Sequence, residues 1–166
     1  MELGAKTIDD MCFGLEEIYI PRYNKSAYDG KGDRAEKGVW IKGPLDLVIV
    51  EGWMLGFQPV ENPPKEMEKV NELLADYVRW EDRFDAAIVI SAADNNFVYQ
   101  WREQAEKMRR DKGEGAMSEA DVKKFCDRFM PSYEVYCPKL NTSGIEGVEK
   151  ERTLKFLLNL DRSPKV

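Results

Sequence analysis

The stretch LDLVIVEGW, Leu45–Trp53, is the clearest indication of the fold in this sequence. It is a short apolar run rich in β-branched residues, and Gly43 and Pro44 precede it. Such runs between turn residues are typical of strands buried inside a parallel sheet. We predict two further strands, at DAAIVISA (Asp85–Ala92) and TLKFLLNLD (Thr153–Asp161).

Segments with helical spacing of apolar residues separate the predicted strands. This alternation favours an α/β fold with a mainly parallel sheet. The sequence contains no repeat and no internal linker, so we predict one domain over residues 1–166. The predicted helices are Leu3–Glu16, about Lys65–Arg79, one with an apolar stripe from Phe97 to Met108, one that Ser118 caps, and a short piece between Pro131 and Pro138.

The composition limits the classes of function. Of 166 residues, 43% are hydrophobic and 34% are charged, and the net charge of −6 argues against sequence-independent nucleic-acid binding. The longest apolar stretch, Leu45–Val50, is too short to span a bilayer, so we expect no membrane insertion. The three cysteines have no metal-like spacing, and we expect them to be reduced. The sequence has no histidine, which excludes Ser-His and Cys-His catalysis.

Glu51 stands where the first predicted strand ends. Ligands of open α/β sheets bind outside the carboxyl ends of the strands. A carboxylate there can hold Mg²⁺ through water or accept a proton from a substrate hydroxyl. The alternative is a carboxylate that only caps the strand end or forms an ion pair. Similarly, Gly52 and Gly56 allow close approach of a ligand, with Trp53 as a large apolar group beside the carboxylate, or the segment forms a tight turn packed on the core.

The segment IPRYNKSAYDGKGDRA, Ile20–Ala35, mixes charged, aromatic and glycine residues with neither a strand nor a helix period. Most connections in compact domains have about four to six residues. Longer irregular segments tend to be either disordered or functional. The length and composition of this segment therefore distinguish it from an ordinary connection.

These two segments, PRYNKSAYDGKGDRA and GPLDLVIVEGWMLGF, closely resemble the D-glycerate 3-kinase family, especially its plant and algal members. VYQWREQAE (Val98–Glu106), AMSEADVKKFCDRFMPSYEVY (Ala116–Tyr136) and LNLDRSP (Leu158–Pro164) are similar to family sequences in the same order. The resemblance implies a three-layer P-loop kinase fold. It also implies transfer of the ATP γ-phosphate to a hydroxyl of D-glycerate, with Mg²⁺. The expected compartment is the chloroplast or the cytoplasm, and the plant-like resemblance favours the organelle.

In such a kinase, Ile20–Ala35 is the expected substrate-binding loop. Its basic residues suit the carboxylate of glycerate and the phosphate of the product, because arginine binds such groups in a fork and lysine binds them as a point charge. Its hydroxyl groups can hydrogen-bond the substrate or orient the basic side chains. The expected substrate-binding residues are Arg22, Tyr23, Lys25, Ser26, Arg34 and, outside the loop, Trp53.

Two carboxylates, Glu51 and Asp33, are the candidate catalytic residues. Many family members have Asp where this chain has Asn24, which weakens any role of position 24 as a base. Glu51 is also the expected ligand of Mg²⁺, through water.

Residues from about 99 to 117 resemble the lid of this class of kinases. Lid arginines reach over the phosphates and neutralise charge that develops in the transition state. The alternative is a solvated helix face on which Glu103 and Lys107 form an i, i+4 pair. The candidate lid arginines are Arg102, Arg109 and Arg110.

One family motif is absent, because the sequence contains no G-x-x-x-x-G-K-[ST]. That phosphate loop supplies the backbone N–H groups and the lysine that hold the β- and γ-phosphates. In the family, the first strand, the phosphate loop and its helix precede the part that resembles this chain. We therefore expect a kinase-like fold that is incomplete at its N-terminus, in which Leu47–Glu51 forms a bare sheet edge that a protein partner would cover.

Three explanations of the missing motif stay open. The sequence can be part of a complete kinase, or the missing half can be a separate chain. Alternatively, the protein can be a kinase-derived subunit without activity that serves in a larger assembly. In that last case the open sheet edge would be the docking site.

Overall fold

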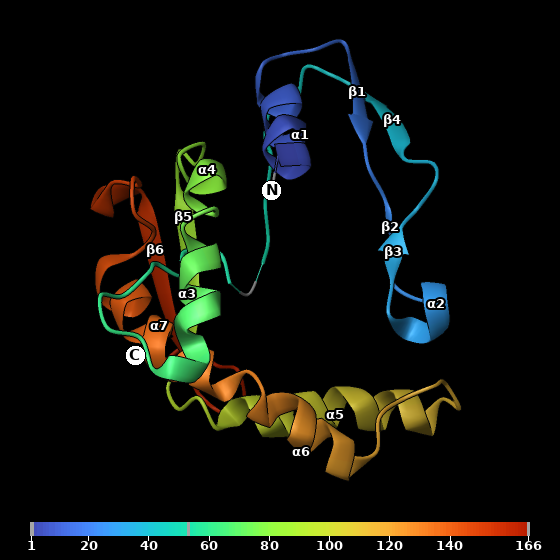
Figure 1. Ribbon diagram of the computed structural model, residues 1–166, viewed down its shortest axis with the longest axis vertical. Coiled ribbons are helices and arrows are strands. Elements are labelled where there is room, and N and C mark those ends of the chain that lie inside the picture. The colour runs from blue at the N-terminus through green and yellow to red at the C-terminus, as the bar shows by residue number, and fades with distance from the viewer. Residues whose placement is uncertain (1, 53, 166) are drawn as a thin grey trace. The chain divides into compact units, whose positions relative to one another are not determined.

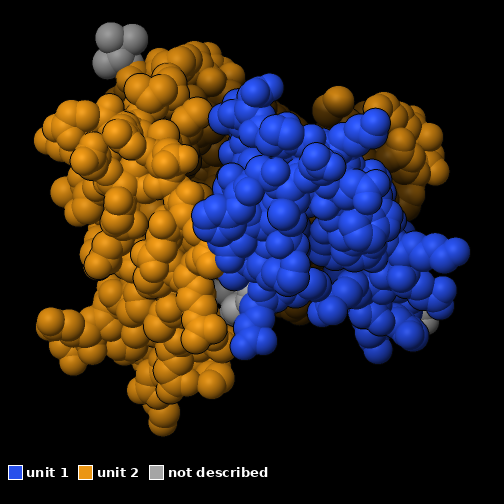
Figure 2. Space-filling view, turned by 90° about the horizontal axis from the view of Figure 1, so that it is seen from above, with its two compact units in different colours: residues 1–55 blue, residues 56–166 orange. Residues whose placement is uncertain are grey.

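The computed structural model describes residues 2–52 and 54–165, apart from the side chains of residues 29 and 30. The chain divides into two compact units, Met1–Leu55 and Gly56–Val166 (Figure 2). Each unit is described by itself, with the element labels of Figure 1.

The first unit consists of one longer helix and two short antiparallel strand pairs (Figure 1). Helix α1 (Glu2–Cys12) buries Ala5 and Ile8. It ends earlier than predicted because Gly14 has a φ of 72°, a left-handed conformation that is common directly after a helix. The strand pairs are β1 (Glu17–Ile20) with β4 (Val39–Lys42), and β2 (Tyr23–Asn24) with β3 (Asp33–Arg34).

The predicted strand Leu45–Trp53 is wrong for the part that the structure describes, because residues 45–52 belong to no strand. A strand needs a neighbour for its backbone N–H and C=O groups, and no segment of the described chain pairs with this one. Its apolar side chains are bare: Leu47 is 74% exposed and Ile49 is 81% exposed. The expected bare sheet edge at Leu47–Glu51 is therefore a bare apolar segment outside any sheet.

The second unit contains the parallel strands that the sequence predicted. β5 (Ala87–Ala92) pairs with β6 (Thr153–Leu158) in parallel, from Ala87 opposite Thr153 to Ala92 opposite Leu158. Helix α7 (Met130–Ser143) packs against β5. A parallel pair with helices between its strands confirms the predicted α/β class.

Local cap chemistry explains some helix boundaries in this unit and not others. α6 (Glu119–Asp127) starts where predicted, and the Ser118 Oγ accepts a hydrogen bond from the Asp121 N–H at 3.2 Å. The short piece predicted between two prolines is wrong: α7 runs on to Ser143, with Pro138 inside it. The predicted helix Lys65–Arg79 is divided into η1 (Lys65–Met67), α3 (Glu68–Leu74) and α4 (Val78–Glu81). The remaining helices are α5 (Phe97–Asp111) and η2 (Lys150–Arg152).

A buried carboxylate, Glu81, lies in the interior of the second unit. It is 1% exposed and accepts two hydrogen bonds, from the Gly56 N–H at 2.7 Å and from the Gln58 Nε2 at 2.5 Å. Burial raises the pKa of the Glu81 carboxyl, although both hydrogen bonds favour the charged form. Glu81 therefore fixes the chain where this unit begins, next to the core ring of Phe57.

We predict that Glu81→Ala lowers the free energy of unfolding by about 1–3 kcal/mol, because it leaves the buried Gly56 N–H and Gln58 amide without a partner. Glu81→Gln keeps the shape and an acceptor for Gly56, so we expect it to be milder. Urea unfolding followed by circular dichroism measures both. An alanine variant as stable as the unsubstituted chain would show that this contact does not support the fold.

The raised pKa of Glu81 predicts that the stability of the fold depends on pH. The folded pKa of Glu81 is raised above its usual 4.5, so its contribution to stability is complete below that value and is lost as the pH rises through the folded pKa. Glutamine has no such loss. The Glu81→Gln variant should therefore gain stability relative to the unsubstituted chain from about pH 4.5 to neutral pH. A stability difference that stays constant over this range would contradict the raised pKa.

Candidate active site

The predicted substrate loop is not irregular but is a hairpin with a helical tip, α2 (Ala27–Gly30). Antiparallel pairing places Tyr23 opposite Arg34 and Asn24 opposite Asp33. Two backbone hydrogen bonds close the hairpin, from the Ala35 N–H to the Arg22 carbonyl and from the Gly32 N–H to the Ala27 carbonyl, each at 2.9 Å. The strands have only two residues each, which explains why no strand period is visible in the sequence.

The ring of Tyr23 fixes the inside of this hairpin. Gly32 has a φ of 79°, and a Cβ on it would lie 2.4–2.8 Å from atoms of the Tyr23 ring. The Tyr23 side chain would have to shift to admit such a Cβ, and the left-handed φ itself favours glycine at this position. The Tyr23 hydroxyl donates to the Lys31 carbonyl at 3.4 Å. Tyr23 thus contributes to the shape of the loop, besides being a candidate ligand.

The candidate substrate ligands of the loop all face solvent. Asp33 accepts the backbone N–H of Arg34 at 2.7 Å, and the Ser26 N–H donates to the Asn24 side chain at 3.0 Å. Among the described residues, the side chains of the loop's cations have no ion pair. These cations are exposed to solvent. The exposed candidates are Arg22, Tyr23, Lys25, Ser26, Asp33 and Arg34.

Glu51 is exposed and lies in the unpaired segment that follows β4, not at the end of a strand. Within the described part of the chain it forms no hydrogen bond and no ion pair, and no described contact joins it to the hairpin. Trp53, the other candidate of this segment, lies outside the described residues. The structure thus places Glu51 and the hairpin in one unit, and among the described residues no hydrogen bond or ion pair joins them.

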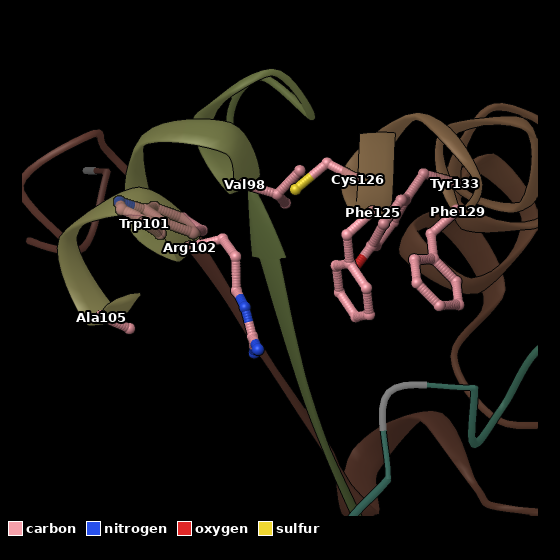
Figure 3. A pocket seen from close by; sticks show the side chains of 8 residues that line it. All are labelled: Val98, Trp101, Arg102, Ala105, Phe125, Cys126, Phe129 and Tyr133. Atoms are coloured by element: carbon pink, nitrogen blue, oxygen red, sulfur yellow. The ribbon is translucent and has the colours of Figure 1, made fainter. Parts of the chain in front are cut away.

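Arg102 is the candidate lid arginine that lines a cavity. The cavity has a volume of about 340 Å³ and lies between α5, α6 and the start of α7. The guanidinium of Arg102 extends from α5 toward the aromatic side chains opposite and lies 4.9 Å from the centre of the Phe125 ring (Figure 3). Its Nε is buried without a hydrogen-bond partner. The residues that line the cavity are Val98, Trp101, Arg102, Ala105, Phe125, Cys126, Phe129 and Tyr133.

The other two arginines hold the lid together instead of facing the cavity. Arg110 pairs with Glu103 and donates to the Met117 carbonyl. Glu103 thus pairs with Arg110 and not, as the helix-face alternative has it, with Lys107. Arg109 lies 3.5 Å from Glu114 and 3.7 Å from Glu106.

Glu106 is the residue that sequence reasoning missed. It is 1% exposed, its Oε1 lies 2.6 Å from Arg102, and its Oε2 accepts the Met117 N–H at 2.9 Å. With Arg110 on the Met117 carbonyl, α5 binds both backbone groups of Met117 and thereby fixes the return of the chain toward α6. The i, i+4 spacing from Arg102 was a visible signal, but only the return of the chain at Met117 explains the burial of Glu106.

A second contact joins α5 to α6 at the other end of the lid. The Tyr99 hydroxyl donates to the Asp127 carboxylate at 2.7 Å, and Lys123 binds the same carboxylate at 2.8 Å. The hydrogen bond to Asp127 raises the pKa of Tyr99 to about 12. Polar contacts therefore stabilise the lid at both of its ends. The cavity that Arg102 lines lies along the same pair of helices, α5 and α6.

The candidate residues suit binding of the Mg²⁺ ion of a kinase better than binding of its nucleotide. No group of three or more potential metal ligands occurs in the described part of the chain. Mg²⁺ in kinases needs only one or two carboxylates together with phosphate oxygens and water, so the free carboxylate of Glu51 fits this role. For the β- and γ-phosphates, the sequence has no phosphate loop to form a cradle.

Among the helices of residues 2–52 and 54–165, none combines the length and the apolar character that crossing a membrane requires.

Comparison with known proteins gives a consistent result, although no family model matches the sequence. The chain is 41% identical over 175 residues to the chloroplastic D-glycerate 3-kinase of Arabidopsis thaliana, a match that includes 99% of this chain. It is 37% identical over 132 residues to the probable ATP-dependent kinase TDA10 of Saccharomyces cerevisiae, which includes 73% of this chain. The structure of a D-glycerate 3-kinase from Cryptococcus neoformans is similar over 90% of this chain, with a TM-score of 0.78 and 28% identity.

Each of these relatives is considerably longer than the matched part. The chain spans 38% of the Arabidopsis protein, 46% of the Saccharomyces protein and 59% of the Cryptococcus structure.

We predict that Glu106→Ala lowers the free energy of unfolding by about 2 kcal/mol, because it leaves the Met117 N–H and the half-buried Arg102 without their partner. Glu106→Gln retains an acceptor for Met117 and should lose less. The matched control is Glu114→Ala, which removes the exposed partner of Arg109 and should change stability by less than about 1 kcal/mol. Urea unfolding of the three variants provides the comparison. Equal losses at positions 106 and 114 would show that the burial of Glu106 is unimportant.

Proposed function

Because the chain belongs to the D-glycerate 3-kinase family, we propose that it forms the acceptor-binding and lid part of a kinase that converts D-glycerate to 3-phosphoglycerate with ATP and Mg²⁺. The observation that carries this proposal is the 41% identity over 99% of the chain, which includes the hairpin, Glu51 and the lid arginines. In this proposal the two units are parts of one kinase domain.

The chain's own residues have distinct roles in the proposed reaction. The unpaired cations of the hairpin bind the carboxylate of glycerate and orient its terminal hydroxyl, with Tyr23 and Ser26 as hydrogen-bond partners. Glu51, or Asp33 of the hairpin, accepts the proton of that hydroxyl. Glu51 also suits Mg²⁺, bound through water. ATP, when bound, supplies the phosphoryl group.

The lid arginines are not equivalent in this proposal. Arg102 also pairs with Glu106, but it faces a cavity and its Nε has no partner, so it is the best candidate to meet negative charge from the substrate side. Arg109 and Arg110 are engaged with glutamates and with Met117, so their proposed role is to hold the lid in shape.

A second candidate function is a kinase-derived subunit without activity of its own. The observations that favour it are the missing phosphate loop and the bare apolar segment at Leu47–Glu51, which a protein partner would cover. The compartment is likewise a proposal: the chloroplast, as for the Arabidopsis relative, or the cytoplasm.

The direct test is a chimera that joins the part of the Arabidopsis kinase preceding the matched region to this chain. We expect the chimera to phosphorylate D-glycerate in a coupled assay with ATP and Mg²⁺. Glu51→Gln should lower kcat by about 10²- to 10⁴-fold with little change in Tm, because the side chain is exposed and only the proton acceptor is lost. Glu61→Gln, at another exposed position, is the matched control. No turnover by the chimera would reject the proposed function.

Substrate binding can be tested separately in the same chimera. Arg34→Ala should raise KM for glycerate by about 10- to 100-fold with a smaller effect on kcat, because it removes a charge-assisted hydrogen bond to the carboxylate. Arg34→Lys keeps the charge without the fork and should recover part of the loss. Arg152→Ala, at an exposed arginine of the second unit, should leave KM unchanged. An unchanged KM for Arg34→Ala would remove the hairpin from the substrate site.

A further inference from the structure

The hairpin of the first unit extends from the β1–β4 strand pair, and the pairing is interrupted between the two. β1 pairs with β4 as far as Ile20 opposite Val39, and pairing begins again at Tyr23 opposite Arg34. Figure 1 shows the two strand pairs one beyond the other, with α2 at the tip. We call the interruption, residues 21–22 and 35–38, the ribbon joint.

The two sides of the ribbon joint differ in length. Residues 21–22 connect the strand pairs on one side and residues 35–38 connect them on the other, and none of these residues belongs to a described strand. Extra residues on one side of a ribbon leave backbone groups unpaired and bend the chain, so they change where the side chains beyond them point. The Ala35 N–H donates to the Arg22 carbonyl, but this bond closes the hairpin and does not reach β1 or β4.

The side chain of Tyr19 bridges the joint. Tyr19 lies in β1, and its hydroxyl accepts a hydrogen bond at 2.7 Å from the N–H of Gly38, the last residue of the longer side. A Cβ on Gly38 would lie 2.3 Å from the Ile20 carbonyl oxygen and 2.6 Å from the Tyr19 ring. The two sides of the joint are therefore so close that any side chain at position 38 would force the backbone apart.

The ring of Tyr19 is itself held by the β1–β4 pair. Trp40 is its partner across the strands, and the centres of the two rings are 5.3 Å apart. Cross-strand aromatic pairs of this kind stabilise a ribbon beyond the area that they bury. On the other face of β1, Ile18 is 0% exposed, so this strand is anchored in the core of the unit. Tyr19 thus connects an anchored strand pair to the start of the hairpin.

The two arginines of the proposed substrate site lie directly at this joint. Arg22 is part of it, and Arg34 is the residue before its longer side. Both are exposed. A change in the angle of the hairpin at the joint would move both guanidinium groups together, relative to the anchored strands.

We propose that Tyr19 is a positioning residue for the substrate: its hydroxyl fixes the hairpin at the ribbon joint and so places Arg22 and Arg34 for the carboxylate of glycerate. This inference rests on the proposed function. It adds a residue that acts through the hairpin and does not itself touch the substrate.

The first test uses Tyr19→Phe in the chimera with the Arabidopsis part, because phenylalanine keeps the ring and removes only the hydroxyl. KM for glycerate should rise about 3- to 10-fold, as expected for the loss of one hydrogen bond, while kcat stays within about twofold. Tyr77→Phe, at a half-buried tyrosine of the second unit, is the matched control and should leave KM unchanged. An active chimera in which Tyr19→Phe has an unchanged KM overturns the proposal.

A double-mutant cycle separates positioning from a general loss of stability. If Tyr19 acts through the arginines, Tyr19→Phe should raise KM by a smaller factor in the Arg34→Ala background than in the presence of Arg34. The same factor in both backgrounds would overturn the proposal, because the two residues would then act independently.

Nitrogen-15 relaxation of the full chain gives a readout that does not depend on kinase activity. Tyr19→Phe should increase the amplitude of motion of the hairpin amides, residues 22–35, relative to those of β1 and β4. Tyr77→Phe should not, and unchanged hairpin order parameters in Tyr19→Phe overturn the proposal.

The relaxation measurement also separates this inference from the proposed function. An inactive chimera together with a more mobile hairpin in Tyr19→Phe rejects the kinase activity and supports Tyr19 as the residue that fixes the hairpin. An active chimera in which Tyr19→Phe changes neither KM nor hairpin motion supports the activity and rejects the role of Tyr19.

Discussion

The backbone of a strand is stable in a folded protein only when another strand bonds its N–H and C=O groups. This constraint explains the main features of both units. β5 and β6 have each other and form a sheet, whereas residues 45–52 have the composition of a buried strand but no neighbour within the described chain. In the unpaired segment, Leu47 and Ile49 are exposed as a result.

The lid shows how similar residues come to have different roles. Three arginines of one helix looked equivalent by charge and position. The buried Glu106 contacts the Met117 N–H, Arg102 at 2.6 Å and Arg109 at 3.7 Å, while Arg110 donates to the Met117 carbonyl. Arg102 has an unpartnered Nε beside an aromatic cavity, whereas Arg109 also lies 3.5 Å from the exposed Glu114, so the electrostatic environments of these two arginines differ.

Features that depend on local chemistry could be predicted from the sequence. The apolar runs of β5 and β6 and the cap at Ser118 are of this kind. Features that depend on distant partners could not. Strand formation at Leu45–Trp53 depends on a neighbouring strand that no described segment provides. The burial of Glu106 depends on the path of the chain after the helix. The candidate substrate residues of the hairpin came from resemblance alone, since strands of two residues leave no periodic signal.

The packing of Tyr23 against Gly32 has a consequence for the energetics of the loop. A long surface segment normally loses much conformational freedom when it closes on a small molecule, and that loss subtracts from affinity. Here the backbone around the charged side chains is already held by the ring, by the glycine conformation and by the cross-strand bonds. If the hairpin binds an anion as proposed, the binding then requires mainly the ordering of a few arginine and lysine side chains. A backbone that is already formed before binding lowers the entropy lost and so favours affinity for a small ligand.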